Sequence, residues 1–150
     1  MIRIKRVYAP PAETDGVRLL VDRLWPRGIS KAAARIDEWR KDLAPSNALR
    51  KWFGHDPTKW EEFQSRYRTE LESAGKMEEF LILGERARRE AITMVYAARD
   101  EERNNAVVIK RLIENLHGPS ASTRATDGGP ASRKLSGPVP KNGKSNLTRS

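Results

Sequence analysis

Three short apolar runs in the sequence predict β-strands. Apolar residues recur at Ile2, Ile4 and Val7 in "IRIKRVY", and aliphatic or β-branched residues fill most of "GVRLLVDRLW" and "AITMVYAA". Runs of this length and composition are typical of buried strands. Two strands are therefore expected near the N-terminus and a third near residue 92.

Helical patterns lie between the second and third predicted strands. Ser30 is a suitable N-cap for a helix whose apolar face is formed by Ile36, Trp39 and Leu43, spaced three and then four residues apart. Further along, Asp56 is placed to cap a helix that has a proline at its first position, where the missing N–H has no cost.

The helix after Asp56 carries an aromatic stripe formed by Trp60, Phe63, Tyr67 and Leu71. Such a stripe can stack nucleic-acid bases, but its spacing is also what a buried helix face requires. We favour the core interpretation. Two more helices are predicted. The apolar face of the first is formed by Met77, Phe80, Leu81 and Ala87. The second has Asn104 or Asn105 as its cap and Gly118 as its stop, and its apolar face is formed by Ile109, Leu112, Ile113 and Leu116.

Strands separated by helices predict the fold class, an α/β domain over residues 1–117. The expected architecture is a small, mostly parallel sheet flanked by helices, three-layered and Rossmann-like. In such sheets ligands bind at the carboxyl ends of the strands. Two polar loops, "DRLWPRG" after the second strand and "RDEERNN" after the third, should therefore meet at one edge.

The residues in these loops suit an anionic ligand. Arginine forks and a helix N-terminus both favour phosphate or carboxylate. Structural alternatives remain open: Asp22 and Asp100 can form ion pairs within the loops, Asn104 can be only a cap, and Trp25 can cover the sheet edge. The candidate ligand-binding residues are Arg23, Trp25, Arg27, Arg99, Asn104 and Asn105.

Candidate groups for proton transfer are Asp22, His55 and Asp100. His55 lies in "RKWFGHDP", and its usual pKa range suits acid–base chemistry, although a loop histidine next to a helix cap is also common. The sequence contains no G-x-G-x-x-G, Walker-type or G-x-S-x-G motif. A specific reaction is therefore not predicted.

Composition bears on whether the protein has a metal or cofactor site and on where in the cell it is found. The chain has no cysteine and two histidines, so neither a metal site nor a cofactor is expected. Its apolar runs are far shorter than the roughly 20 residues of a membrane span. The segment "MIRIKRVYAP" has no apolar core typical of a secretory signal, and we expect a cytoplasmic protein.

The segment 118–150 differs from the rest in composition and charge. It is rich in Gly, Pro, Ser and Thr, and it holds six lysine or arginine residues against one aspartate, which is five of the nine net positive charges of the chain. This composition predicts a disordered tail. The tail is either a solvated extension or a basic arm that adds salt-sensitive attraction to nucleic acid.

Three long segments resemble the YeaO-like family, domain-of-unknown-function family 488, in the same order along the chain. They are "DGVRLLVDRLWPRGISK", "DEWRKDLAPSNALRKWFGHDPTKWEEFQSRY" and "MVYAARDEERNNAVVIKRLIENL". The resemblance covers nearly all of residues 2–117 and implies a compact α/β domain of a bacterial cytosolic protein. It implies no reaction, because the family is named for lacking one.

The chain differs from the family pattern at two positions. The pattern has aspartate where this chain has Ala9, and histidine where this chain has Arg103. A catalytic acid or base at either position would be lost, whereas an arginine at 103 adds to an anion site.

Three hypotheses of function follow from the sequence. The first is binding of an anionic, phosphate-bearing partner, either a nucleotide or a nucleic acid. The second is an enzyme that acts on a small anionic substrate by acid–base catalysis. The third is a protein interaction domain. Oligomeric state is not predicted.

Overall fold

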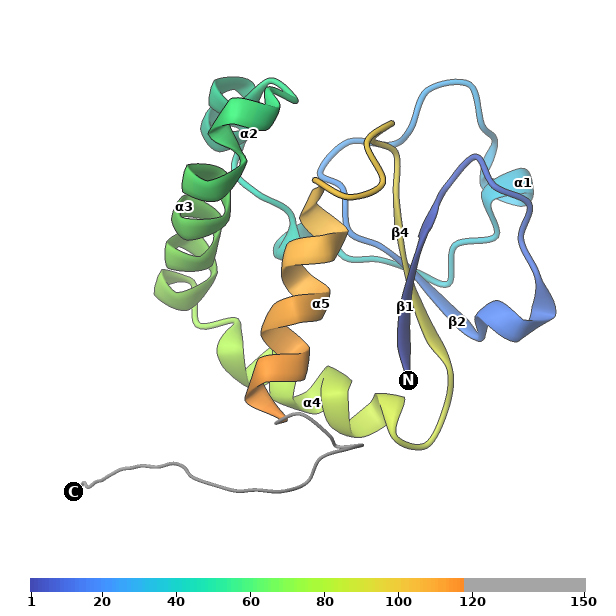
Figure 1. Cartoon of the computed structure of the whole chain (residues 1–150). Coiled ribbons are helices and arrows are strands. Elements are labelled where there is room, and N and C mark those ends of the chain that lie inside the picture. The colour runs from blue at the N-terminus through green and yellow to red at the C-terminus, as the bar shows by residue number, and fades with distance from the viewer. Residues whose placement is uncertain (118–150) are drawn as a thin grey trace, which may run out of the picture. The chain divides into compact units, whose positions relative to one another are not determined.

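The computed structural model describes residues 1–117 and contains a four-stranded parallel sheet (Figure 1). The strands are β1 (Ile2–Arg6), β2 (Val17–Leu20), β3 (Glu38–Trp39) and β4 (Ile92–Tyr96), in the spatial order β1-β4-β2-β3. All three strand pairs are parallel, so every strand ends at the same edge. The three predicted strands are confirmed, and the predicted disorder of residues 118–150 lies outside the described residues.

Helices cover the two faces of the sheet unequally (Figure 1). Four of the five helices lie on one face, and only α1 covers the other, together with a 3₁₀ turn at Glu13–Asp15. The predicted α/β class with three layers is confirmed, with one layer much thinner than the other. The helices are α1 (Lys31–Ala34), α2 (Asn47–Phe53), α3 (Trp60–Ser73), α4 (Met77–Ala87) and α5 (Asn105–Leu116).

The alternation of side chains along β4 explains both cores. Met94 and Tyr96 point into the large cluster formed with α2 to α5, whereas Val95 packs against Leu20 and Ala34 on the opposite face. Every residue of β4 is buried. A central parallel strand is covered on both sides, which is why its sequence is a nearly continuous apolar run.

The helix predicted after Ser30 is wrong in length. The Ser30 hydroxyl accepts a hydrogen bond from the Ala33 N–H at 3.1 Å, as a cap should. The helix nevertheless ends at Ala34, because Arg35 adopts a left-handed φ of 52°. Trp39, expected on the inner face of this helix, lies in β3 instead.

The early stop of α1 has a tertiary cause. The buried guanidinium of Arg18 binds the Ala34 carbonyl at 2.8 and 3.1 Å and the Arg35 carbonyl at 3.2 Å. These contacts satisfy carbonyls at the end of the helix. The chain then pairs with β2, and its Asp37 N–H donates to the Arg18 carbonyl at 2.9 Å.

The remaining predicted helices are confirmed, with two exceptions in their inner faces. Asp56 accepts a hydrogen bond from the Thr58 N–H, and Asn104 caps α5 by accepting from the Val107 N–H at 3.0 Å. Leu81 and Leu116, predicted to face inward, are 45% and 40% exposed. The aromatic stripe of α3 is core, as favoured, since its buried residues are Phe63, Tyr67 and Leu71.

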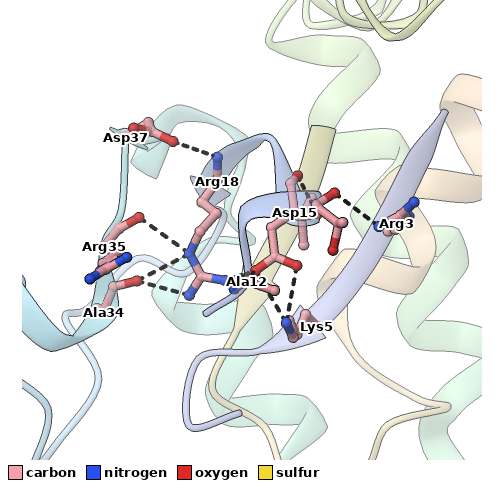
Figure 2. A network of polar contacts seen from close by, with 10 residues as sticks. Arg3, Lys5, Ala12, Asp15, Arg18, Ala34, Arg35 and Asp37 are labelled. Carbon is pink, nitrogen blue, oxygen red and sulfur yellow. Dashed lines mark hydrogen bonds and ion pairs between the residues drawn. The ribbon is translucent and has the colours of Figure 1, made fainter. Parts of the chain in front are cut away.

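A buried ion-pair network fastens the thin layer to the sheet (Figure 2). Asp15 accepts from Arg18 at 2.7 Å, from Lys5 at 3.0 Å and from the Ala12 N–H at 3.0 Å. Arg18 is 3% exposed, and its other N–H groups donate to the carbonyls at the end of α1. Burial alone raises the pKa of Asp15, but these hydrogen bonds outweigh burial and hold the pKa below its usual value. We refer to Lys5, Asp15 and Arg18 as the buried network.

Candidate ligand-binding site

A cavity of about 750 Å³ lies at the edge where the strands end, a size typical of small-molecule sites. The loop after β2 leads to α1 on one face of the sheet, and the loop after β4 leads to α5 on the other (Figure 1). β2 and β4 are neighbours. Their loops therefore diverge and leave the kind of crevice in which open parallel sheets bind ligands.

All nine residues that the sequence suggested for a site line this cavity. They come from the loop after β2, the loop after β4, the start of α5 and the segment after α2, and they are Asp22, Arg23, Trp25, Arg27, His55, Arg99, Asp100, Asn104 and Asn105. Their roles differ, because some of these side chains are fully occupied by contacts within the protein and others are not.

Asp22 joins three elements at the base of the cavity. One carboxylate oxygen accepts from the Ala97 N–H at 2.9 Å, and the other accepts from the Asn105 side-chain amide at 3.0 Å. The same amide donates to the Val21 carbonyl at 2.7 Å. Burial raises the pKa of Asp22 above its usual value, and these hydrogen bonds, with the charges of Arg50 and His55, only partly oppose it.

Arg23 and Trp25 form walls of the cavity and have partners in the protein. Arg23 donates to the Pro45 carbonyl at 3.0 Å. The Trp25 indole N–H donates to the Ile29 carbonyl at 2.8 Å, and its ring meets the ring of Trp39 edge-on, with centroids 5.4 Å apart. Both side chains hold the loop after β2 in shape.

Asp100 and Asn104 organise the turn that leads into α5. Asp100 accepts from the backbone N–H groups of Glu102 and Arg103 and forms an ion pair with the Arg103 side chain at 3.1 Å. The hydrogen bond from Glu102, followed by those from Arg103, lowers the pKa of Asp100. Asn104 is 2% exposed and bonds at both ends, to the Asp100 carbonyl and the Val107 N–H.

Three cationic side chains around the cavity have no such partner. Arg27, Lys51 and Arg99 are exposed, and none forms a side-chain hydrogen bond or ion pair with any residue in 1–117. Arg50 stands beside them, with a single long hydrogen bond of 3.4 Å to Asn47. We refer to Arg27, Arg50, Lys51 and Arg99 as the cationic rim.

Sequence reasoning missed the contribution of α2 to this rim. Arg50 and Lys51 lie on α2, a helix of seven residues that the apolar pattern did not indicate. Its signals were present: Ser46 caps it by accepting from the Leu49 N–H, and Gly54 ends it with a φ of 55°. Only the packing of α2 shows that its cations line the cavity.

The geometry around His55 is that of a loop residue. It is exposed, its φ is 58°, and its ring centroid lies 6.2 Å from that of Phe53. It lines the cavity together with Asp22, and its charge is the smallest of the effects that partly oppose the rise in the pKa of Asp22. Of the two positions that depart from the family pattern, Arg103 lines the cavity and Ala9 does not.

Residues 1–117 contain neither a cluster of metal ligands nor a helix that could span a membrane. No group of three or more histidine, aspartate or glutamate residues there is arranged to hold a metal ion. None of the helices there has the length and apolar character that a membrane span requires.

Comparisons with known proteins identify the family. Residues 1–132 match the family model described as "Inactive DUF488-N3 subclade". The chain is 41% identical over 112 residues to the uncharacterized protein Rv3073c of Mycobacterium tuberculosis, which covers 75% of this chain and 92% of that protein. It is 39% identical over 118 residues to the uncharacterized protein YeaO of Escherichia coli, which covers 77% of this chain and 98% of YeaO. No solved structure gave a significant match. The chain therefore belongs to the YeaO-like DUF488 family, in the subclade described as inactive.

Proposed function

We propose that the cavity at the strand ends binds an anionic ligand that carries phosphate, of the nucleotide or nucleic-acid type. The observation that carries the proposal is that three side chains of the cationic rim line one cavity and have no partner within residues 1–117; they are those of Arg27, Lys51 and Arg99. Elsewhere in these residues arginines are commonly paired, as Arg40 is with Asp42 and Glu79. Unpaired guanidinium groups around a concavity are suited to bidentate contacts with phosphate.

Two further features support the proposal. The turn into α5 lies at the same cavity, so the positive end of a 12-residue helix adds to the potential there. The matching family model is described as inactive, which favours a protein that retains a ligand site without turnover.

Acid–base catalysis is the second candidate, and the observation in its favour is the raised pKa of Asp22. A carboxyl group of this kind at the base of a cavity is suited to proton transfer. Both its oxygens, however, already accept hydrogen bonds that hold α5 and β4 to β2, a structural task that accounts for its position. Binding is therefore the function we propose.

Thermal unfolding in the presence of candidate ligands tests the proposal. The panel contains inorganic phosphate, ribose 5-phosphate, the 5′-mononucleotides and short DNA and RNA oligonucleotides. A ligand at about 100 times its Kd stabilises the folded state by about 2.7 kcal/mol, an easily measured shift. No shift with any phosphate compound at low salt would contradict the proposal and favour a protein interaction domain.

The salt dependence of binding separates a small ligand from a polyanion. A nucleic acid that contacts several cations loses affinity steeply between low and moderate salt, and a mononucleotide loses much less. Replacing the six lysine and arginine residues of segment 118–150 by glutamine should flatten the slope for an oligonucleotide. An unchanged slope would remove the basic segment from the proposal.

A further inference from the structure

The base of the cavity offers hydrogen-bond acceptors, in contrast to its rim. An ionised carboxylate has about four lone-pair positions. Asp22 uses one position on each oxygen, for the Ala97 N–H and the Asn105 amide. One position on each of two neighbouring oxygens therefore remains, in a residue that lines the cavity.

Asn105 adds to the acceptor character of the base. Its side-chain nitrogen donates twice, to Val21 and Asp22, which fixes the orientation of the amide. Its side-chain oxygen has no hydrogen-bond donor among residues 1–117, and the residue lines the cavity. A polar atom in this position is satisfied by water or by a donor of the ligand.

The two groups of side chains that line the cavity thus favour opposite chemistry. The cationic rim presents only donors, since guanidinium and ammonium groups have no acceptor atoms. The base presents two adjacent carboxylate positions and an amide oxygen. A ligand that satisfies both groups has an anionic group for the cationic rim and at least two neighbouring donors for Asp22 and Asn105.

We infer that the cavity takes a small phosphate ester with a pair of adjacent O–H or N–H donors, the phosphate at the cationic rim and the paired donors on Asp22. The inference rests on the proposed function and names the ligand class and its orientation. A nucleic-acid strand whose phosphates span the rim does not need the base, so the inference favours a mononucleotide or sugar phosphate. The cavity of about 750 Å³ has room for such a molecule.

The paired donors can come from two parts of a nucleotide. The cis-diol of ribose offers two O–H groups side by side, and the edge of guanine offers two parallel N–H groups. Each matches a carboxylate in a bidentate contact. The choice between them is decided by comparing nucleotides that differ only in these groups.

Calorimetric titration of the full chain with four nucleotides tests the inference. The probes are the 5′-monophosphates of adenosine, 2′-deoxyadenosine, guanosine and 2′-deoxyguanosine. If the diol binds Asp22, both ribonucleotides bind about tenfold or more tightly than their deoxy forms, since hydrogen bonds to a charged acceptor are strong. If the guanine edge binds, both guanine nucleotides exceed both adenine nucleotides by a similar factor.

Two other outcomes of the titrations separate failure of the inference from failure of the proposed function. Equal affinity for all four nucleotides overturns the inference and leaves the proposed function standing, because phosphate alone then accounts for binding. No binding of any nucleotide, of ribose 5-phosphate, of inorganic phosphate or of the DNA and RNA oligonucleotides overturns the proposed function itself, whereas binding of oligonucleotides alone overturns only the inference.

A pair of variants locates the donors at Asp22. D22N should abolish the preference among the four nucleotides, whereas inorganic phosphate should still bind at least as tightly as it does to the unaltered chain, since the cations of the rim remain and one negative charge near them is removed. D37N is the control, because Asp37 also accepts a backbone N–H, from Arg18 at 2.8 Å, and does not line the cavity. A preference that survives in D22N overturns the inference. If D22N does not fold, the nucleotide comparison on the unaltered chain remains decisive.

Discussion

The buried network and the cationic rim are both groups of charged side chains at the same sheet, yet they differ in every contact they make. In the network, Asp15, Arg18 and Lys5 satisfy one another and the carbonyls at the end of α1 (Figure 2). At the rim, Arg27, Lys51 and Arg99 reach solvent with no partner within residues 1–117. A charge with complete partners serves the fold, whereas charges that share a cavity without partners are available to a ligand.

Both regions include residues in or directly after β2. Arg18 lies within β2 and faces the thin layer, and Asp22 follows the end of the same strand. The sequence "VRLLVDRLWPRG" therefore passes from one region into the other within a single stretch. Stability and binding can be altered separately by changes only a few residues apart.

The largest expected effect is the loss of stability when Arg18 is replaced. R18M leaves Asp15 buried with Lys5 as its remaining cation, and removing one partner of a buried pair costs about 3–5 kcal/mol. Urea unfolding measures this change. The double variant R18M/D15L should recover most of the loss, since an apolar pair avoids an uncompensated charge. A loss below about 1 kcal/mol in R18M would show that the network is not needed for the fold.

Replacing either of two glycines with positive φ should cause a smaller loss of stability, and the two variants can be compared directly. A Cβ at Gly16, next to Asp15, would lie 2.2 Å from the Ala91 carbonyl oxygen, whereas a Cβ at Gly28 has no atom within 4 Å. G28A should cost roughly 1 kcal/mol for the left-handed conformation alone, and G16A roughly 3 kcal/mol because of the added clash. Equal losses in urea unfolding would mean that the chain relaxes around Gly16.

The two aspartates predict opposite dependences of stability on pH. The pKa of Asp15 is lowered from 3.8, so its contribution is present above pH 3.8 and is lost as the pH falls through the lower folded value. The pKa of Asp22 is raised from 3.8, so the folded state binds this proton more tightly and its unfavourable contribution diminishes as the pH falls toward 3.8.

Unfolding measured from pH 7 to pH 3 separates these contributions. Relative to D22N, the unaltered chain should gain stability as the pH is lowered toward 4. Relative to D15N, it should lose stability below about pH 4. Parallel curves for all three proteins would contradict the assigned pKa directions.

The smallest expected effect on stability is that of the rim. R27A, K51A and R99A should each change the free energy of unfolding by less than about 0.5 kcal/mol, because exposed side chains without partners contribute little. A loss above 1 kcal/mol in any of them would reveal a structural contact and would weaken the contrast with the buried network.

Much of the fold was predictable because its signals are local. The apolar runs of β1, β2 and β4 and the caps at Asp56 and Asn104 are features of short segments. Parallel order then brings the loops after β2 and β4 to one edge. Eight of the nine candidate residues share a cavity for this reason, whereas His55 follows α2 and reaches the cavity only through packing.

The remainder depends on contacts between distant segments. β3 has two residues, and its place is set by hydrogen bonds to β2 and by Arg18 at the end of α1. Arg23 and Arg27 look alike in sequence, but only Arg23 finds a carbonyl, that of Pro45. Packing decides whether a charged side chain finds a partner. The sequence therefore predicted the edge of the sheet at which the site lies, but not which of its residues have structural roles and which are available to a ligand.

The most direct test of the account is calorimetric titration of two charge-matched double variants with adenosine 5′-monophosphate. R27A/R99A removes two unpaired cations of the rim. R88A/R89A removes two arginines that directly follow α4 and lie near Glu85, at 3.9 and 3.3 Å. The account predicts that Kd rises about 100-fold or more in R27A/R99A and less than about threefold in R88A/R89A. Equal affinities in the two variants would contradict the claim that the rim is the ligand site.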